Sequence, residues 1–260
     1  MALRPVLVVA LLGTLVASSA SAQGGTVPLE GQWTGMSAIP VRARHGEVAF
    51  LAESRFGVAR DVQLGTYVAG LVAPQVTAMG RVLERGGFHV SLRGGLMYPT
   101  PFLALVTGSG SGALLPADTT PPQALRIEAG VRATYEWPRR QLLTLAIAGF
   151  VAPRFTHTDS PVLDFPFLYP RFAALDCNGT ARFTLTGEGV VAGPFRWVAS
   201  LDTWVLPVVH HGFALEPRAG LAWVAKRRVT LELGYRGTWA RYPAGLSYQN
   251  APYADVRVRF

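Results

Sequence analysis

Histidine, aspartate and serine stand close together in one short stretch of this 260-residue chain. His157, Asp159 and Ser160 lie within the letters THTDS, and His210 follows further along. A serine nucleophile, a histidine base and a carboxylate that orients the histidine are the parts of a hydrolase, provided that the fold brings them together. The same residue types are also common in solvated loops, and we favour that interpretation. The sequence therefore predicts no catalytic residues, with a surface hydrolase built on these four as the alternative.

No metal ion or cofactor is expected either. His210 and His211 are adjacent, and adjacent side chains of an extended chain point to opposite sides, which does not suit a shared metal ion. Cys177 is the single cysteine and cannot form a disulfide within the chain. The glycine-rich stretches 92–95 and 108–112 lack the Lys-Ser/Thr pair of a phosphate-binding loop. These stretches are interpreted as turns.

The elements that would position such residues are strands. In 228–242, apolar or aromatic residues alternate with polar or charged ones, and the same alternation recurs in 124–137. Successive side chains of a strand point to opposite faces, so each segment has one apolar and one polar face. Pro74 marks a doubtful point within 64–84. The pattern predicts about ten strands, with eight to twelve possible: 47–59, 64–84, 87–99, 124–137, 141–154, 179–192, 195–206, 213–225, 228–241 and 253–260.

The segments that connect these strands alternate in length. Tight turns are expected at 84–87, 137–141, 192–195 and 225–228. Longer loops, rich in Gly, Pro and Asp, are expected at 100–123, 155–178, 207–212 and 242–252. Short turns at one end and long loops at the other are typical of an up-and-down barrel in a bacterial outer membrane.

The N-terminus reads as an export signal. Arg4 precedes an apolar run over 5–16, and Ala20-Ser21-Ala22 forms a cleavage site, so residues 1–22 are predicted to be a signal peptide. Residues 23–45 are expected to be a periplasmic segment or an extra hairpin, and 46–260 the barrel. Hydrophobic residues make up 50 % of the chain, but no later apolar run is long enough for a spanning helix.

The apolar face is expected to point outwards, toward lipid. The polar face carries charges of both signs, which would pair across neighbouring strands inside a narrow lumen. Aromatic residues gather at strand ends, as in the girdles at a membrane interface: Tyr135, Trp137, Trp197, Trp223, Trp239 and Tyr242. The predicted lumen charge network is Arg126, Glu128, Arg132, Glu136, Arg182, Glu188, Glu216, Arg218, Glu232 and Arg236.

The last eight residues, YADVRVRF, carry the most specific pattern. Ala254, Val256, Val258 and Phe260 share one face of a strand that ends in an aromatic residue. This strand resembles the terminal strand of Gram-negative outer-membrane β-barrel proteins, although that family often has Tyr where Val258 stands. The resemblance implies an all-β, antiparallel transmembrane barrel in the cell outer membrane. It also implies that these four residues are an assembly signal recognised by the barrel-assembly machinery.

The expected function follows from the size of the barrel. About ten strands leave an interior that side chains largely fill, which argues against a general porin. A structural or complex-forming subunit, or a narrow small-solute channel, is expected, with an omptin-like protease or lipid A deacylase-like hydrolase as the alternative. The expected partners are outer-membrane lipids, lipopolysaccharide and further envelope-complex proteins. Despite the net charge of +8, an exported barrel is not expected to bind nucleic acid.

Overall fold

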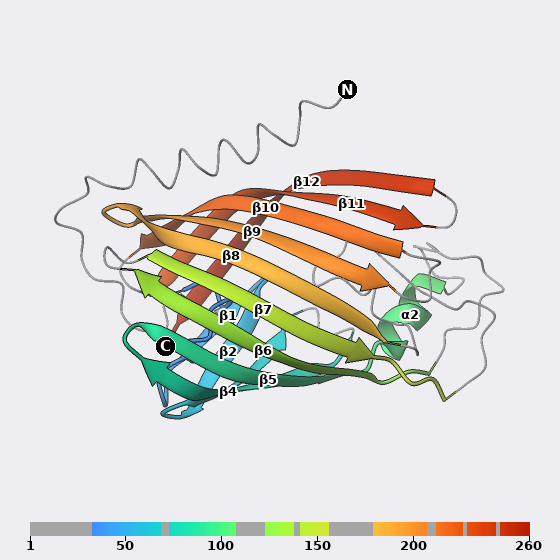
Figure 1. Cartoon of the computed structure of the whole chain (residues 1–260), viewed down its shortest axis with the longest axis horizontal. Helices are drawn as coiled ribbons and strands as arrows, with labels where there is room; N and C mark the ends of the chain where they lie inside the picture. The colour runs from blue at the N-terminus through green and yellow to red at the C-terminus, as the bar shows by residue number, and fades with distance from the viewer. Residues whose placement is uncertain are drawn as a thin grey trace.

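The chain forms one closed barrel of antiparallel strands in the computed structural model (Figure 1). The structure describes residues 33–68, 73–107, 123–137, 141–155, 179–206, 212–225, 228–242 and 245–260. Each strand pairs with its neighbours in sequence, and the last strand returns to pair with the first. The twelve strands in these ranges are β1 (Gly46–Ala49), β2 (Glu53–Ala59), β3 (Val62–Tyr67), β4 (Gln75–Arg85), β5 (Phe88–Met97), β6 (Arg126–Trp137), β7 (Gln141–Val151), β8 (Thr180–Ala192), β9 (Phe195–Leu206), β10 (Gly212–Ala225), β11 (Val229–Tyr242) and β12 (Gly245–Arg259).

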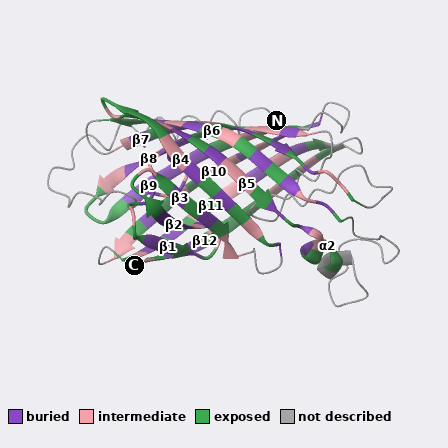
Figure 2. Ribbon diagram, turned by 90° about the horizontal axis from the view of Figure 1, so that it is seen from below, coloured by how far each residue is buried: buried purple, intermediate pink, exposed green. Residues whose placement is uncertain are grey.

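The alternation in the sequence becomes an inside and an outside. In β6, Arg126 and Arg132 are buried, whereas Ile127 and Val131 between them are exposed. Exposed and buried residues alternate in the same way along most strands (Figure 2). In a single-layer closed sheet the buried face is the interior, so the polar side chains face the lumen, as the sequence predicts. The barrel is thus polar inside and apolar outside.

The strand count is twelve rather than about ten, because two predicted strands are each divided. The predicted strand 47–59 turns at 50–52 into β1 and β2. Side chains replace ladder partners there: the Ala49 N–H donates to Ser54 Oγ at 3.0 Å, and the Leu51 N–H donates to Asp255 Oδ1 at 2.8 Å. The predicted strand 64–84 likewise becomes β3 and β4, separated by the connection that contains Pro74.

The final strand is longer than predicted. β12 begins at Gly245, within the stretch 242–252 that was expected to be a long loop, and it pairs with β11 along its whole length. The error arises because the stretch contains Pro243, Gly245, Asn250 and Pro252, residue types that favour turns. Leu246 and Tyr248 still alternate outwards, 72 % and 54 % exposed.

The two ends of the barrel differ. The connections at 60–61, 86–87 and 193–194 lie at one end, here called the turn end, together with Gly46 and Phe260 where the barrel strands start and stop. The opposite end, here called the loop end, carries the longer connections and the helix α2 (Thr100–Thr107) (Figure 1). No helix in the described ranges is long and apolar enough to cross a membrane.

Most of the predicted girdle aromatics face outwards. Trp137 and Trp223 are 45 % and 44 % exposed, but Trp197 on β9 is only 7 % exposed. A Cβ atom at Gly187 or Gly189 of β8 would lie 2.8 Å from the Trp197 indole. The glycines thus leave room for the ring to lie flat against the neighbouring strand, which buries it.

Candidate functional site: the charged lumen

A segment of the chain that precedes the first strand lies inside the barrel. The Ala38 N–H donates to Thr134 Oγ1 at 2.7 Å, and the Ala38 carbonyl accepts a hydrogen bond from Ser91 Oγ at 2.5 Å. The Val41 N–H donates to Gln63 Oε1 at 2.9 Å. The three side chains come from β6, β5 and β3 and all face the lumen. The main chain of this segment therefore hydrogen-bonds to separate parts of the wall.

Arginines of the wall bind the same segment through its carbonyl groups. Arg132 Nη1 donates to the Gly35 carbonyl at 2.7 Å, and Arg55 Nη2 donates to the Trp33 carbonyl at 2.9 Å. Gly35 has a positive φ of 90°, and a Cβ atom there would lie 3.3 Å from Cζ of Arg55, so a side chain at this position would be both strained and crowded. Charged donors to buried carbonyls are among the stronger hydrogen bonds in proteins.

The segment reaches β8 and β9 as well. The Thr34 N–H donates to Glu188 Oε2 at 2.9 Å, and the Arg196 guanidinium lies 5.1 Å from the centre of the Trp33 ring. Residues 33–42 are here called the plug segment. Its wall partners Gln63, Ser91, Thr134, Glu188 and Arg196 lie in the turn-end half of their strands, so the plug segment occupies the turn-end half of the lumen.

Residues 23–45 were expected to be a periplasmic segment or an extra hairpin, and this stays a prediction for the stretch as a whole. The part described, 33–45, contributes none of the named strands. The segment instead passes over Gly57, where a Cβ atom would lie 2.2 Å from the Arg42 carbonyl oxygen. It has no strand periodicity because its partners are side chains of the wall, and sequence patterns carry no signal for such a conformation.

Charged residues form a first cluster at the join between β12 and the neighbouring strands. Glu232 pairs with both Arg218 and Arg257, and it accepts a hydrogen bond from the Tyr253 hydroxyl at 2.7 Å. Arg257 also pairs with Asp255 at 3.1 Å. Glu47 extends the group to β1 and β2, pairing with Arg55 at 2.5 Å and Arg259 at 3.1 Å. We call these eight residues the seam cluster.

A second cluster crosses the wall from β2 to β8. Arg93 donates to Glu53 from two nitrogens at 2.9 Å each, and its Nε donates to Glu128 at 2.9 Å. Arg182 Nη2 lies 3.9 Å from the same Glu128 carboxylate. We call Glu53, Arg93, Arg126, Glu128, Arg132 and Arg182 the arginine-rich cluster. The cluster contains four guanidinium groups and two carboxylates, and the carboxylates pair with Arg93 and Arg182.

The predicted lumen residues have different environments. Glu216 pairs with Arg236 at 3.0 Å and accepts a hydrogen bond from Trp204 Nε1 at 3.1 Å. Arg132 and Glu188 bind the main chain of the plug segment, as described above, instead of acting as members of inter-strand ion pairs. Glu136 lies near the turn end with its side chain 46 % exposed, and its carboxylate lies 3.9 Å from His89 Nε2.

Several lumen residues were not anticipated from the sequence. Glu47, Glu53, Arg55 and Arg93 belong to the two clusters, and their strands show a weaker alternation than β6 or β11. Attention to the polar face of the short segments would have found them. Their pairing depends on which strands become neighbours, which the sequence pattern does not contain.

The four weak catalytic candidates, His157, Asp159, Ser160 and His210, lie outside the described residues. No group of three or more metal-ligating side chains occurs in the described ranges. The residues of the expected assembly signal lie on the outer face of β12: Ala254, Val256, Val258 and Phe260 are all exposed.

No protein-family model matches the chain, and no curated protein matches it. Solved structures with a similar fold include an anion-selective porin from Comamonas acidovorans (10 % identity, TM-score 0.44), which covers 80 % of this chain and 58 % of its own. OmpT, an outer membrane protein of Vibrio cholerae, has 9 % identity and a TM-score of 0.48, covering 94 % of this chain and 73 % of its own. The outer membrane channel DcaP of Acinetobacter baumannii has 9 % identity and a TM-score of 0.42, covering 93 % and 69 %.

The chain spans 58 % of the length of the Comamonas porin and 64 % of a second OmpT structure. At these identities the likeness concerns the barrel fold and assigns no function. The class of the protein rests on its own geometry: a closed antiparallel barrel with an apolar outer wall and a charged interior is an outer-membrane β-barrel. Its location is the cell outer membrane, since lipid is what covers such a wall.

Proposed function

We propose that this protein is a largely plugged outer-membrane barrel that conducts small solutes through a narrow path. The observation that carries the proposal is the set of hydrogen bonds from the wall to the plug segment. These bonds come from β2, β3, β5, β6 and β8, so they hold the segment against an arc of the wall that runs from β2 to β8. A wide aqueous channel requires about 16–18 strands and an interior free of such contacts.

The two charge clusters narrow the remaining space. Arg257 and Glu232, at the centre of the seam cluster, are each 1 % exposed, and the arginine-rich cluster reaches inward from the opposite wall. A charged side chain that pairs with several partners is held in one position, so these clusters stay ordered in the lumen. The path that remains suits ions and small solutes.

Planar-bilayer recording of the purified protein tests the proposal. The unmodified protein is expected to give small current steps. A triple variant, Ser91→Ala, Thr134→Val and Arg132→Met, removes three of the wall groups that hold the plug segment and is expected to give larger or more frequent steps. Thr186→Val is the matched control, because Thr186 is a buried lumen-facing threonine whose hydroxyl has no hydrogen-bond partner.

Three outcomes separate the alternatives. Porin-sized steps from the unmodified protein would contradict a plugged lumen. No current from either the unmodified protein or the triple variant would favour a structural or complex-forming subunit. Hydrolysis of a lipid or peptide substrate by the purified protein would favour the surface-hydrolase alternative, for which the described residues supply no supporting observation.

The partners expected from the sequence remain part of the proposal. Arg241 at the loop end is exposed on the outer face, where it would meet lipid phosphates such as those of lipopolysaccharide. Recognition of the terminal strand by the barrel-assembly machinery is supported by the outward, unobstructed row of apolar side chains on β12.

A further inference from the structure

The two charged clusters of the lumen differ in their balance of charge. The seam cluster holds four arginines (Arg55, Arg218, Arg257 and Arg259) and three carboxylates (Glu47, Glu232 and Asp255), and Glu216 forms a separate pair with Arg236. The arginine-rich cluster has four arginines for two carboxylates, with Asp202 of β9 as a further acid nearby, engaged by the Thr184 hydroxyl. Arg126 and Arg182 of this cluster lie near the loop end of their strands.

Arg126 is the least compensated of these groups. It is 4 % exposed, and its Nε atom is buried with no hydrogen-bond partner. Within the described ranges its side chain contacts the Phe150 ring, with Cζ 4.2 Å from the ring centre, and forms no ion pair. The neighbouring carboxylate, Glu128, already accepts a hydrogen bond from Arg93 and lies 3.9 Å from Arg182. A buried cation without an anionic partner is costly, so this position calls for an anion.

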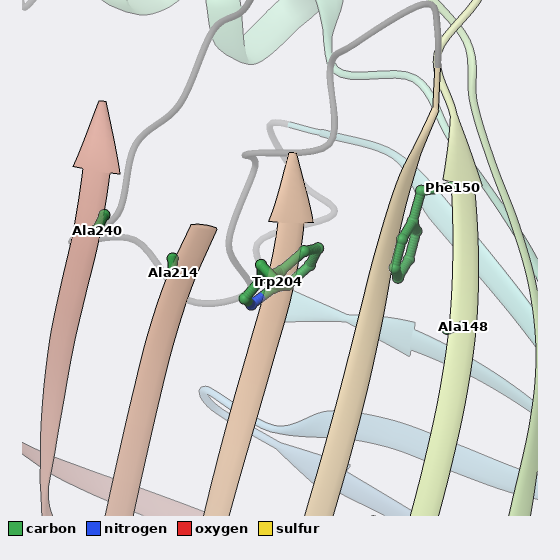
Figure 3. Close-up of a cluster of buried hydrophobic side chains, with 5 residues drawn as sticks. All are labelled: Ala148, Phe150, Trp204, Ala214 and Ala240. Atoms are coloured by element: carbon green, nitrogen blue, oxygen red, sulfur yellow. The ribbon is translucent and has the colours of Figure 1, made fainter. Parts of the chain in front are cut away.

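Aromatic rings lie beside Arg126 and Arg182, the two arginines of the cluster that lie near the loop end. Phe150 and Trp204 stack with ring centres 5.4 Å apart. The Arg182 guanidinium lies 5.3 Å from the centre of the Phe150 ring and 5.2 Å from that of Trp204. The same inward cluster includes three small residues on the neighbouring strands, Ala148, Ala214 and Ala240 (Figure 3).

Strand register explains why these side chains meet. Ala148 pairs with Arg182, Arg182 with Trp204, Trp204 with Ala214, and Ala214 with Ala240, so the five form one inward row across β7 to β11. The row lies near the loop end of each of these strands. It combines cationic, aromatic and small apolar surface, whereas the turn-end half of the lumen is occupied by the plug segment.

The geometry points to a binding site for a small organic carboxylate at this place. The carboxylate would bind Arg126 and Arg182, which offer planar, charged donors suited to both of its oxygens. The apolar body of the solute would lie against the Phe150 and Trp204 rings. The inference deepens the proposed function, on which it rests in one respect: the loop end of the lumen must admit solutes.

Benzoate is the probe, since it combines a carboxylate with an apolar ring, and benzamide is its uncharged counterpart. Titration calorimetry on the full-length processed protein in detergent is expected to show benzoate binding at one site, with benzamide at least about tenfold weaker. Arg126→Met is expected to weaken benzoate binding at least about tenfold, the effect of losing a charged hydrogen bond. Arg126→Lys retains the charge without the planar group and is expected to be intermediate.

Arg241→Met is the matched control, because it removes the same charge at the same end of the barrel from the outer face. It is expected to bind benzoate as the unmodified protein does. The midpoint of urea unfolding without ligand separates binding from structure. Arg126 forms no ion pair with the residues that the structure describes, so replacing it leaves none of their carboxylates without a partner. Arg126→Met should therefore unfold at the same or a higher urea concentration than the unmodified protein.

Equal benzoate affinity in Arg126→Met and the unmodified protein, or equal binding of benzoate and benzamide, would overturn the site. A lowered unfolding midpoint with unchanged affinity would instead make Arg126 a structural residue and would also overturn it. The conductance measurement is independent: benzoate binding in a protein that passes no current would retain the site and contradict the proposed channel.

Discussion

Gly46 and Phe260 exchange two main-chain hydrogen bonds at the seam that closes the barrel. The N–H of each residue donates to the carbonyl oxygen of the other at 3.0 Å. A Cβ atom at position 46 would lie 2.6 Å from Cζ of the Phe260 ring, so the ring lies directly over the glycine. The last residue of the chain thus covers the first residue of the first strand, which joins the terminal strand to barrel closure in a single contact.

Replacing the terminal aromatic residue tests this closure. Phe260→Ala removes the ring over Gly46, and an open edge in lipid would leave main-chain groups unpaired at several kcal/mol each. We expect the variant to be exported and processed, but to accumulate as protease-sensitive protein with little heat-shifted band on gels. Leu246→Ala, an equally exposed residue near the other end of β12, is the control and should assemble normally. Normal yield of folded Phe260→Ala would argue against a role for the terminal residue.

Adjacent residues of β6 test which face meets lipid. Val131 is exposed on the outer wall, whereas Arg132 is buried and donates to the Gly35 carbonyl. An arginine on the lipid face near mid-bilayer costs ~2–4 kcal/mol. Val131→Arg should therefore reduce the amount of heat-modifiable protein strongly, and Arg132→Val should assemble. Arg132→Val leaves a carbonyl of the plug segment without its donor, but it does not leave a carboxylate without its arginine. Similar yields of the two variants would contradict the assigned orientation.

The centre of the seam cluster should contribute much of the stability. Glu232 is 1 % exposed, so Glu232→Gln removes a buried anion that Arg218 and Arg257 share and leaves Asp255 as the other acid paired with Arg257. Loss of one partner of a buried pair costs about 3–5 kcal/mol. Glu136→Gln, at a half-exposed side chain, should change the free energy of unfolding by less than about 0.5 kcal/mol. Urea unfolding followed by tryptophan fluorescence measures both, and comparable losses would refute the difference.

Glycine positions on the wall differ in the space around them. A Cβ atom at Gly234 would lie 2.5 Å from the Ala219 carbonyl oxygen and 2.5 Å from the Tyr253 ring, whereas one at Gly80 would have no atom within 4 Å. Gly234→Ala should therefore destabilise the barrel by about 1–3 kcal/mol, because a main-chain atom cannot move aside as a side chain can. Gly80→Ala should be neutral or slightly stabilising. The same unfolding assay decides, and a neutral Gly234→Ala would show that the strands adjust.

The strands and the inward and outward faces of their side chains could be predicted from the sequence. Alternation in 124–137 and 228–242 predicted strands, and the mixed charges of the polar face predicted which face would be inside. Both are properties of neighbouring residues in one strand, because the direction of a side chain depends on its position along the chain. The terminal row from Ala254 to Phe260 was predicted to face outwards for the same reason.

Only the tertiary structure decided the features that depend on closure of the barrel: the strand count, the ion-pair partners and the position of the plug segment. The segment 47–59 divides where Ser54 and Asp255 replace ladder partners, and 64–84 divides at the connection that contains Pro74, so twelve strands form instead of about ten. The partners of Glu232 and Arg93 follow from strand register, which links residues far apart in sequence. The plug segment has no periodic pattern because its hydrogen bonds go to side chains of several strands at once. Such bonds exist only after the barrel has closed around it, which is why the alternation of residues along single strands did not predict them.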